Sequence, residues 1–397
     1  MQLKLSFVAG LIATSALAVA APVEQERGIN IEISKRATLT KAGTSEIDWT
    51  KVDAHMSSLR AKYAKNFANY EKNTGKVHPQ KRELPEHLAK RATGTVSLTD
   101  QQGGELWTGT MAYGTPAQSF PIDFDTGSSD TLVNPGAYTP SKSSTSKTNG
   151  DQFSTAYGDG TTAQGTIYTD TVHIAGLSAA NTAIGVSNTQ FIDSSEGSQG
   201  ISGMALPQLA AFGSKYLPYF YSLKNAGAVS SGKFQFDLRT SGSTLFLGGT
   251  NSAKYSTTPI YQSLDSSQGF WQVPASVNGQ SIESIVDTGT TIIVAPTSQA
   301  KQLFAKLGLP TFTQDGSTYA YYNCNSPPTI TFKYGSYSKS LSAATTSFGT
   351  TNNGDCVLSI AGGDVGVNAW VTGDSWLQNT VAIFDTDNNR VGFANKA

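Results

Sequence analysis

The spacing of apolar residues differs from one part of the chain to the next, and the first part has the pattern of a targeting segment. Residues 7–19 are largely apolar, follow a positively charged start and end in the small-x-small triplet Ala18-Val19-Ala20. The run is too short and too interrupted by polar residues to span a bilayer. It is typical of a secretory signal peptide, so we assign residues 1–20 to a signal. We expect a secreted, extracellular protein without a membrane anchor, although a vacuolar location stays open.

A different pattern, the three- and four-residue spacing of an amphipathic helix, occurs within residues 52–70. The recurring apolar residues are Val52, Met56, Leu59, Tyr63 and Phe67. Their stripe predicts a helix that packs its apolar face on the rest of the protein. Basic residues, among them Lys62 and Lys65, stand beside this stripe.

From residue 92 onward the pattern is that of short strands separated by turn residues. Expected strands include residues 95–98, 109–113, 165–174, 243–247 and 329–334. Helical signals are few: residues 297–307, with Thr297 or Ser298 as N-cap and Gly308 beyond the end, and a short stretch around 216–223. The pattern therefore predicts an all-β protein.

Charge divides the chain at the same place. Residues 21–91 contain 14 Lys and Arg against 9 Asp and Glu, whereas residues 92–397 contain 13 against 20. The dibasic pair Lys90-Arg91 lies at this break and is a candidate cleavage site for a kexin-type processing protease. We therefore predict a propeptide at 21–91 and a mature protein beginning at Ala92. The acidic mature chain argues against a nucleic-acid partner.

Cys324 and Cys356 are the two cysteines of the chain. In an oxidising compartment we expect them to form a disulfide, which would stabilise the fold by about 3–4 kcal/mol. The chain has no Cys-x-x-Cys, and no His lies near either cysteine, so we predict no metal site and no cofactor.

The triplet Asp-Thr-Gly occurs twice, at Asp125-Thr126-Gly127 and, 162 residues later, at Asp287-Thr288-Gly289. Both copies follow apolar residues and continue into a hydroxyl residue, Ser128 or Thr290. Two copies in a chain of this length have a chance of roughly one in a hundred at ordinary residue frequencies. A lone triplet would be read as a surface turn, but the matched context predicts two equivalent loops.

A second repeat accompanies the first. Ile201-Ser202-Gly203 follows the first triplet and Val371-Thr372-Gly373 follows the second, at similar distances. Each is an apolar strand ending in glycine, which suggests a duplicated half in which a loop passes close to the strand. We therefore divide the mature chain into lobes at residues 92–265 and 266–397, related by a pseudo-twofold axis.

Two aspartates brought together at such an axis would give a hydrolytic site without a metal. Carboxyl groups about 3 Å apart cannot both ionise cheaply, so one stays protonated and one charged. The charged group can take a proton from water while the neutral group donates to an amide oxygen. Gly127 and Gly289 permit tight turns, Thr126 and Thr288 can bond across the loops, and Ser128 and Thr290 can orient the outer oxygens. The proton belongs to the pair Asp125 and Asp287, not to one member.

These loops resemble those of the pepsin-like aspartic proteases, the standard example of such a carboxyl pair. Tyr157-Gly158-Asp159-Gly160 is similar to the tip of the family's flap hairpin, and Tyr113-Gly114-Thr115-Pro116 matches a further stretch. The resemblance covers essentially all of 92–397 and is strongest to the secreted acid proteases of filamentous fungi, the penicillopepsin and aspergillopepsin type. It implies a bilobal β fold with the active-site cleft between the lobes, and a monomeric enzyme acting on proteins and peptides.

The resemblance also implies roles for single residues. Asp125 and Asp287 would be catalytic, and Tyr157 would close over the substrate. Gly158, Asp159, Gly289 and Thr291 would bond the substrate backbone, and Phe191 and Ile201 would line a hydrophobic pocket, so that apolar residues are preferred around the cut bond. An acid at Asp159 implies acceptance of Lys on the acyl side, although a turn-forming Asp-Gly explains it equally well.

In the precursors of this family a prosegment lysine lies on the catalytic pair, and Lys62-Tyr63 is the matching candidate. We expect the basic propeptide to dock on the acidic body and to leave at low pH, with either self-cleavage or a separate protease cutting at Lys90-Arg91. The chain departs from the family at Leu132, where a Trp that bonds the flap tyrosine is usual, and at Ser202 and Thr372, where aliphatic residues are common.

Other functions fit less well. The mature chain has one histidine, His173, so a serine or cysteine peptidase lacks its base. A zinc protease motif is missing, and neither a glycosidase nor a β-sandwich lectin explains the twin loops. The alternative that stays open is a pepsin-fold binding or inhibitor protein without activity, but the motifs carry none of the damage that such proteins show.

Overall fold

The computed structural model describes residues 28–35, 39–84, 107–156, 162–192 and 197–397. The expected signal, the strand at 95–98, the Lys90-Arg91 pair and the motif at 157–160 lie outside these residues. Within them, no helix is long and apolar enough to cross a membrane.

Two sheets form most of the described structure. The larger has 13 strands among the described residues, in the spatial order β11 (Ile260–Ser263), β23 (Arg390–Ala394), β22 (Val381–Asp385), β9 (Lys233–Asp237), β10 (Ser243–Leu247), β1 (Ile29–Lys35), β2 (Trp107–Tyr113), β3 (Gln118–Asp125), β8 (Gly200–Gly203), β4 (Thr131–Val133), β7 (Leu177–Ser187), β6 (Thr162–Ile174) and β5 (Gln152–Ala156). The smaller runs β15 (Thr311–Gln314), β16 (Ser317–Tyr322), β20 (Cys356–Gly362), β14 (Ile293–Ala295), β21 (Trp370–Thr372), β13 (Gln280–Val286), β12 (Gln272–Val277), β17 (Thr331–Tyr334) and β18 (Tyr337–Ser340), with β19 (Ser347–Thr350) beside β20. Among the described residues, the α-helices are α1 (Trp49–Thr74), α3 (Tyr219–Asn225), α4 (Thr297–Lys306), α5 (Ala343–Thr346) and α6 (Asp374–Leu377).

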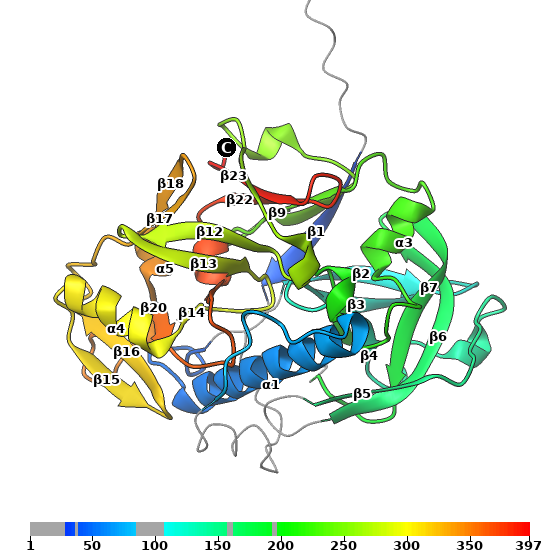
Figure 1. Ribbon diagram of the computed structural model, residues 1–397, viewed down its shortest axis with the longest axis horizontal. Coiled ribbons are helices and arrows are strands. Elements are labelled where there is room, and N and C mark those ends of the chain that lie inside the picture. The colour runs from blue at the N-terminus through cyan, green and yellow to red at the C-terminus, as the bar shows by residue number, and fades with distance from the viewer. Residues whose placement is uncertain (1–27, 36–38, 85–106, 157–161, 193–196) are drawn as a thin grey trace, which may run out of the picture.

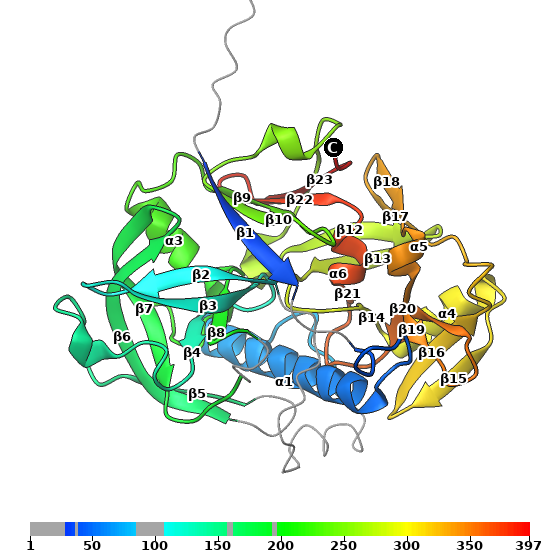
Figure 2. The same ribbon diagram turned by 180° about the vertical axis from the view of Figure 1, so that it is seen from behind.

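The strands gather into two lobes, with β2 to β8 in one and β12 to β21 in the other (Figure 1). Helix α1 lies across both lobes, and the reverse view shows β1 passing between them (Figure 2). A disulfide joins Cys324 and Cys356 as expected. The all-β, bilobal prediction is therefore confirmed.

The two lobes repeat the same local topology around the Asp-Thr-Gly loops. In one, β8 pairs parallel with β3 and antiparallel with β4. In the other, β21 pairs parallel with β13 and antiparallel with β14. A Cβ added to Gly203 would lie 2.4 Å from the Ser129 carbonyl carbon, and one added to Gly373 would lie 1.9 Å from the Thr290 oxygen. The expected close passage of a loop beside each glycine is thus observed in both lobes.

Helix α1 confirms the amphipathic prediction. It extends beyond residues 52–70 at both ends, because the Asp48 carboxylate accepts the N–H groups of Thr50 and Lys51, and Gly75 ends the helix at φ 70°. All five stripe residues are buried, at 2 % exposure or less. They join a cluster with residues of both lobes, including Leu209 and Val367. Burying each such side chain contributes roughly 1.5–3 kcal/mol, so the stripe holds α1 on the body.

Two details of the helices differ from the sequence expectation. Helix α4 is capped by Pro296 without a side-chain hydrogen bond, so the assignment of Thr297 or Ser298 as N-cap is wrong. Helix α3 begins only at Tyr219, because Pro218, at φ −53° and ψ 148°, interrupts the expected 216–223 segment. Gly308 follows α4 at φ 65°, as predicted.

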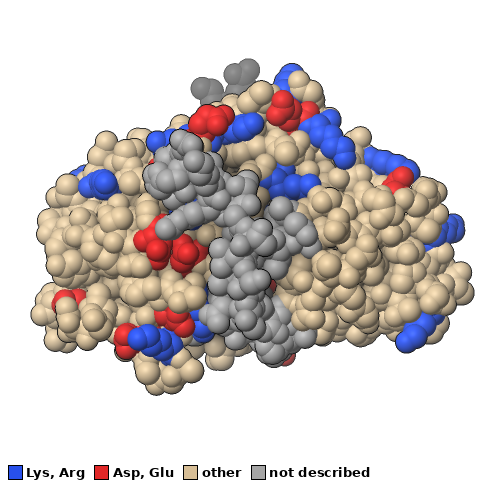
Figure 3. All heavy atoms as spheres, turned by 90° about the horizontal axis from the view of Figure 1, so that it is seen from below, with Lys and Arg blue, Asp and Glu red and all other residues tan. Residues whose placement is uncertain are grey.

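The face seen from below carries few charges among its described residues (Figure 3). Lys and Arg are scattered there between uncharged side chains, and acidic residues stand close to several of them (Figure 3). Long-range attraction of a polyanion needs cations gathered on one surface. That part of the surface therefore offers no continuous basic patch.

Candidate active site

The carboxyl groups of Asp125 and Asp287 meet where the two lobes touch. Asp125 ends β3, and Asp287 follows β13 directly. Both are buried, at 3 % and 0 % exposure. Each accepts the backbone N–H of the glycine two residues on: Gly127 N lies 2.8 Å from Asp125 Oδ1, and Gly289 N lies 3.0 Å from Asp287 Oδ1. One oxygen of each carboxyl group is thereby fixed by its own loop.

The second oxygen of each carboxyl group accepts a hydroxyl. Ser128 Oγ donates to Asp125 Oδ2 at 2.6 Å, and Thr290 Oγ1 donates to Asp287 Oδ2 at 2.8 Å. These are the contacts that the sequence predicted for the two hydroxyl residues. Because both oxygens are held, neither carboxyl group can rotate without breaking a charge-assisted hydrogen bond.

Thr126 and Thr288 bind the two loops to each other in a symmetric pattern. The backbone N–H of each threonine donates to the other's Oγ1 at 3.0 Å. Thr126 Oγ1 donates in turn to Val286 O at 2.9 Å, and Thr288 Oγ1 donates to Phe124 O at 2.7 Å. Four buried hydrogen bonds thus join the lobes directly beneath the carboxyl groups, as predicted.

The two glycines are required for a different reason from the one expected. Neither Gly127 nor Gly289 has a positive φ, so their turns do not need glycine for conformational freedom. A Cβ at Gly127 would instead lie 2.5 Å from Asp287 Oδ1, and one at Gly289 would lie 2.2 Å from Asp125 Oδ1. Each glycine makes room for the aspartate of the opposite loop.

Lys62 of α1 reaches both carboxyl groups. Its Nζ lies 2.8 Å from Asp125 Oδ1, 2.9 Å from Asp287 Oδ1 and 3.0 Å from Asp287 Oδ2. The neighbouring Tyr63 donates its hydroxyl to Asp287 Oδ2 at 3.1 Å. Further along α1, Asn66 Nδ2 donates to Gly127 O at 2.8 Å. Lys62 and Tyr63, the pair named from the sequence, therefore lie directly on the two carboxyl groups.

Charge and burial act in opposite directions on these groups. Burial would lower the pKa of Lys62, but the two carboxylates raise it above its usual value. Burial would raise the pKa of Asp287, and the charge and hydrogen bonds of Lys62 overcome that effect, so its pKa is lowered. Burial, followed by repulsion from Asp287, leaves the pKa of Asp125 raised despite Lys62. The two carboxyl groups are therefore not electrostatically equivalent.

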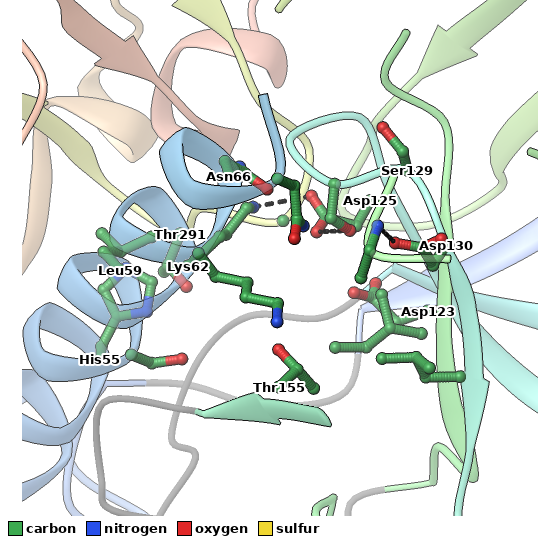
Figure 4. Close-up of a pocket in the computed structure, with 18 of the residues that line it drawn as sticks. His55, Leu59, Lys62, Asn66, Asp123, Asp125, Ser129, Asp130, Thr155 and Thr291 are labelled. Carbon is green, nitrogen blue, oxygen red and sulfur yellow. Dashed lines mark hydrogen bonds and ion pairs between the residues drawn. The ribbon is translucent and has the colours of Figure 1, made fainter. Parts of the chain in front are cut away.

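A cavity of about 110 Å³ remains between α1 and the N-terminal lobe, beside the carboxyl pair (Figure 4). Its protein wall includes Leu132 and Ile201 together with the carboxyl groups of Asp123 and Asp130. On the α1 side His55, Leu59 and Lys62 face it (Figure 4). The cavity is thus apolar on one wall and acidic near the Asp125 loop.

Asp123 and His55 are site residues that the sequence reasoning missed. Asp123 precedes Asp125 by two positions on β3, is 2 % exposed and accepts the Trp107 N–H at 3.1 Å. Burial raises its pKa well above the usual value. The alternation of a strand places residues i and i+2 on one face, and that signal could have identified Asp123. His55 could have been found from its place on the helix, seven residues before Lys62.

The remaining named residues lie as follows. Ile201 and Thr291 line the cavity, whereas Phe191 does not line it and packs in an apolar cluster with Leu132 and Ile201. Tyr157, Gly158 and Asp159 lie outside the described residues, so the consequence of Leu132 for the flap stays a prediction.

The two departures Ser202 and Thr372 are buried and hydrogen-bonded. Ser202 pairs with Thr131 at 3.2 Å, and Thr372 pairs with Ser284 at 2.8 Å. Each hydroxyl thus finds a hydroxyl partner where an aliphatic side chain is usual. Across the described residues we find no group of His, Cys, Asp and Glu suited to hold a metal ion.

Comparison with known proteins gives a consistent result. Residues 107–396 match the model of a family described as eukaryotic aspartyl protease. The chain is 40 % identical to the "Secreted aspartyl protease 1" of Malassezia globosa over 99 % of both chains. It is 38 % identical to an "Aspartic protease" of Phaffia rhodozyma over 77 % of this chain and 80 % of the relative. It is also 32 % identical to a "Pepsin A" of Suncus murinus over 72 % of this chain and 80 % of the relative.

Proposed function

Because the chain belongs to the eukaryotic aspartyl protease family and is an aspartic endopeptidase, we propose that Asp125 and Asp287 are its catalytic pair. The observation that carries this proposal is the placement of one amine, Lys62 Nζ, within 3.0 Å of both carboxyl groups. The position of Nζ is within hydrogen-bond distance of both carboxyl groups. A water molecule could therefore be held at the same point by both groups once the segment that carries Lys62 has left.

The fixed carboxyl groups supply both halves of a hydrolysis. The charged member removes a proton from the bound water, whose oxygen attacks the carbonyl carbon of the peptide bond. The neutral member donates its proton to the carbonyl oxygen, so that the tetrahedral intermediate carries no full negative charge. Collapse of that intermediate passes a proton to the leaving nitrogen and restores the pair. Ser128 and Thr290 keep the oxygens oriented through these transfers.

We propose that residues 21–91 are an inhibitory propeptide, that residues 92–265 and 266–397 are the lobes of the mature enzyme, and that secretion follows removal of residues 1–20. Support comes from Lys62 and Tyr63 on the carboxyl pair and from three amides on α1: Asn66, Asn69 and Asn73 donate to backbone oxygens of the first lobe. The residues contacted by α1 become free for substrate only when the helix leaves. Cleavage at Lys90-Arg91 would complete maturation.

The mature enzyme should prefer apolar residues around the cut bond. The stripe of α1 packs on Leu209, Phe270 and Val367, and these side chains would face the substrate once α1 has gone. Apolar burial there favours apolar substrate side chains. Acceptance of Lys on the acyl side through Asp159 belongs to the same proposal, and a cleavage profile on a peptide library tests it.

The catalytic assignment is tested by Asp125→Asn and Asp287→Asn in mature protein. Each exchange keeps the shape and removes the proton exchange, so haemoglobin digestion in acid should fall at least about a thousandfold. Asp315→Asn is a matched control, because Asp315 lies in the β15–β16 turn at φ 49°, which asparagine also adopts. Digestion by the wild type should stop with pepstatin. Undiminished digestion by either variant would contradict the assignment of Asp125 and Asp287 as the catalytic pair.

A further inference from the structure

The prosegment buries two histidines against the body of the enzyme. His55 lies on α1 and is 7 % exposed, and His78 follows α1 and is 2 % exposed. Neither histidine contacts the carboxyl pair that α1 covers, because Lys62 and Tyr63 make those contacts. The burial of the two histidines therefore needs a separate explanation. A solvent-exposed histidine titrates in the range where secreted and acidified compartments differ, so the burial of both rings bears on how the precursor opens.

The surroundings of His55 disfavour a positive charge on its ring. It lines the cavity beside the carboxyl pair, two helical turns before Lys62 (Figure 4). Its Nε2 is buried and has no hydrogen-bond partner among the described residues. The other titratable groups around this cavity are Lys62 and Lys65 on the same helix and Asp123, Asp125 and Asp130 on the first lobe. Burial opposes protonation of His55 most, and the positive charge of Lys62 opposes it as well.

His78 is held as a neutral ring in one tautomer. The Gln80 backbone N–H donates to its Nδ1 at 3.0 Å, so Nδ1 carries no proton, and Nε2–H donates to Gln268 O at 2.8 Å. Phe67, Tyr70 and Phe270 surround the ring at centroid distances of 4.9, 4.7 and 5.2 Å. Protonation of Nδ1 would end the bond from Gln80. The charged group that favours protonation is Asp265, at the end of the first lobe.

We propose that His55 and His78 form a pH switch that loosens the prosegment in mildly acidic surroundings, before Asp287 takes up a proton. The proposal rests on the proposed role of residues 21–91 as an inhibitory propeptide. It gives the precursor two successive acid-dependent locks, one on the histidines and one between Lys62 and the aspartates.

The direction of the effect follows from proton uptake on release. Burial first, and then Lys62, lower the pKa of docked His55 to about 4, while a released histidine titrates near its usual 6.5. The released state therefore binds more protons below pH 6.5, and docking weakens as pH falls from there toward 4. At pH 5 His55 alone should weaken docking about thirtyfold relative to pH 7.5. Burial also lowers the pKa of His78, which Gln268 and Asp265 partly offset.

The lock on the carboxyl pair operates at lower pH. The net lowered pKa of docked Asp287 means that its bond to Lys62 contributes stability above the usual value of 3.8 and loses it as pH falls below that value. His55 therefore acts between pH 6.5 and 4, His78 acts below its usual value of 6.5, and Asp287 acts below 3.8. A compartment at pH 5 to 6 would loosen α1 while the lysine still contacts the pair.

The test uses the full-length precursor with Asp125→Asn, which is expected not to digest itself and retains the Lys62–Asp287 contacts. Hydrogen exchange of α1, corrected for intrinsic rates, gives its opening constant from pH 7.5 to 5. We expect a rise of at least about thirtyfold in this parent, and His55→Gln should remove most of it. The double variant with His78→Gln should be flattest. His173→Gln is the matched control, because His173 lies on β6 and bonds Gly114 O away from α1.

If His55 has a purely structural role, His55→Gln should change the opening constant of α1 by the same factor at every pH, and that result overturns the proposal. An unchanged pH dependence in both His55→Gln and the double variant also overturns it. If His55→Gln does not fold, His55→Leu replaces it, since leucine is apolar and equally unable to titrate. Self-cleavage by the Asp125→Asn parent would contradict the catalytic assignment and leave the histidine comparison intact. In the active precursor, His55→Gln should convert at a lower pH than the wild type.

Discussion

The two aspartyl loops have the same hydrogen bonds and different surroundings. In each, the aspartate accepts the N–H of the glycine two residues on and the hydroxyl three residues on. Asp125, however, adjoins the cavity and has the buried acid Asp123 two positions before it. Asp287 has Ile285 at the equivalent position and accepts the Tyr63 hydroxyl as well.

This contrast separates what a repeated motif determines from what its neighbours determine. The motif fixes where the carboxyl oxygens lie, because the bonds that hold them are internal to the two loops. The neighbours decide how each group titrates: the pKa of Asp125 is raised, first by burial, whereas the lone amine of Lys62 lowers that of Asp287. Geometric symmetry therefore does not imply electrostatic symmetry.

The largest effect should come from Lys62→Met, which removes the charge that both loops share. Losing one partner of a buried ion pair costs about 3–5 kcal/mol, so the precursor at pH 7 should open at least about a hundredfold more often. Cleavage of a fluorogenic peptide by uncut precursor near neutral pH measures this opening as residual activity of the precursor, here called the leak. The excess over wild type should shrink as pH falls below 3.8, since protonated carboxyl groups no longer attract the lysine.

Tyr63→Phe is the matched comparison for that prediction. It removes one hydroxyl, which contacts Asp287 and not Asp125. A hydrogen bond to a charged group contributes about 1.5–3 kcal/mol, so this leak should be clearly smaller than that of Lys62→Met. Equal leaks from both variants would mean that Lys62 contributes little beyond packing.

Thr126→Val and Thr288→Val test the symmetry of the loops themselves. Each removes two of the four crossing hydrogen bonds and leaves a buried N–H and a buried carbonyl without a partner. The cost is roughly 1–3 kcal/mol for each such group. Denaturant unfolding of mature protein should show similar losses for the two variants, with Thr311→Val, on the exposed side of β15, as control. A loss confined to one variant would disprove the symmetry.

Gly127→Ala and Gly289→Ala test the close approach of each loop to the opposite aspartate. The added methyl groups would lie 2.5 and 2.2 Å from that carboxyl group, so it must move. A displacement of this kind costs about a hundredfold in rate, and kcat on a peptide substrate measures it. Gly308→Asn, after α4, is the control, because asparagine tolerates its φ of 65°. Normal kcat in both alanine variants would mean that the loops are less tightly packed.

Much of this arrangement could be predicted from the sequence, because its signals are local or repeated. The stripe of α1 follows from residue spacing, and the roles of Thr126 and Ser128 follow from matched loops. The start of α3 depended on Pro218, a single local restraint that outweighs the apolar pattern around it. Strand β1 was missed although Ile29, Ile31 and Ile33 alternate with polar residues; its partners β10 and β2 lie far away in the chain.

The residues that tune the site were harder to predict. His55 is significant because α1 docks with that face on the cavity, and the position of Lys62 seven residues later identifies the face only once docking is known. Asp123 carried a usable signal in its two-residue distance from Asp125. The missing element was burial, which converts an ordinary acid into one whose pKa is raised.

The smallest effect should come from Asp123→Asn, which makes the first loop electrostatically more like the second. The raised pKa of Asp123 means that the folded state binds an extra proton above pH 3.8, so its contribution to stability falls as pH rises. Asparagine keeps an acceptor for the Trp107 N–H and does not titrate. The precursor variant should therefore gain stability over wild type from pH 5 to pH 7, on the order of 1 kcal/mol or a few degrees in Tm.

Thermal unfolding at pH 5, 6 and 7 measures that gain, and Asp123→Leu serves as the comparison. Leucine also removes the titration but leaves the Trp107 N–H without its acceptor, so it should show the same pH dependence at lower stability throughout. A constant difference between Asp123→Asn and wild type would mean that Asp123 does not change its protonation on folding. In that case the inequality of Asp125 and Asp287 would have to come from the cavity and from Tyr63 alone.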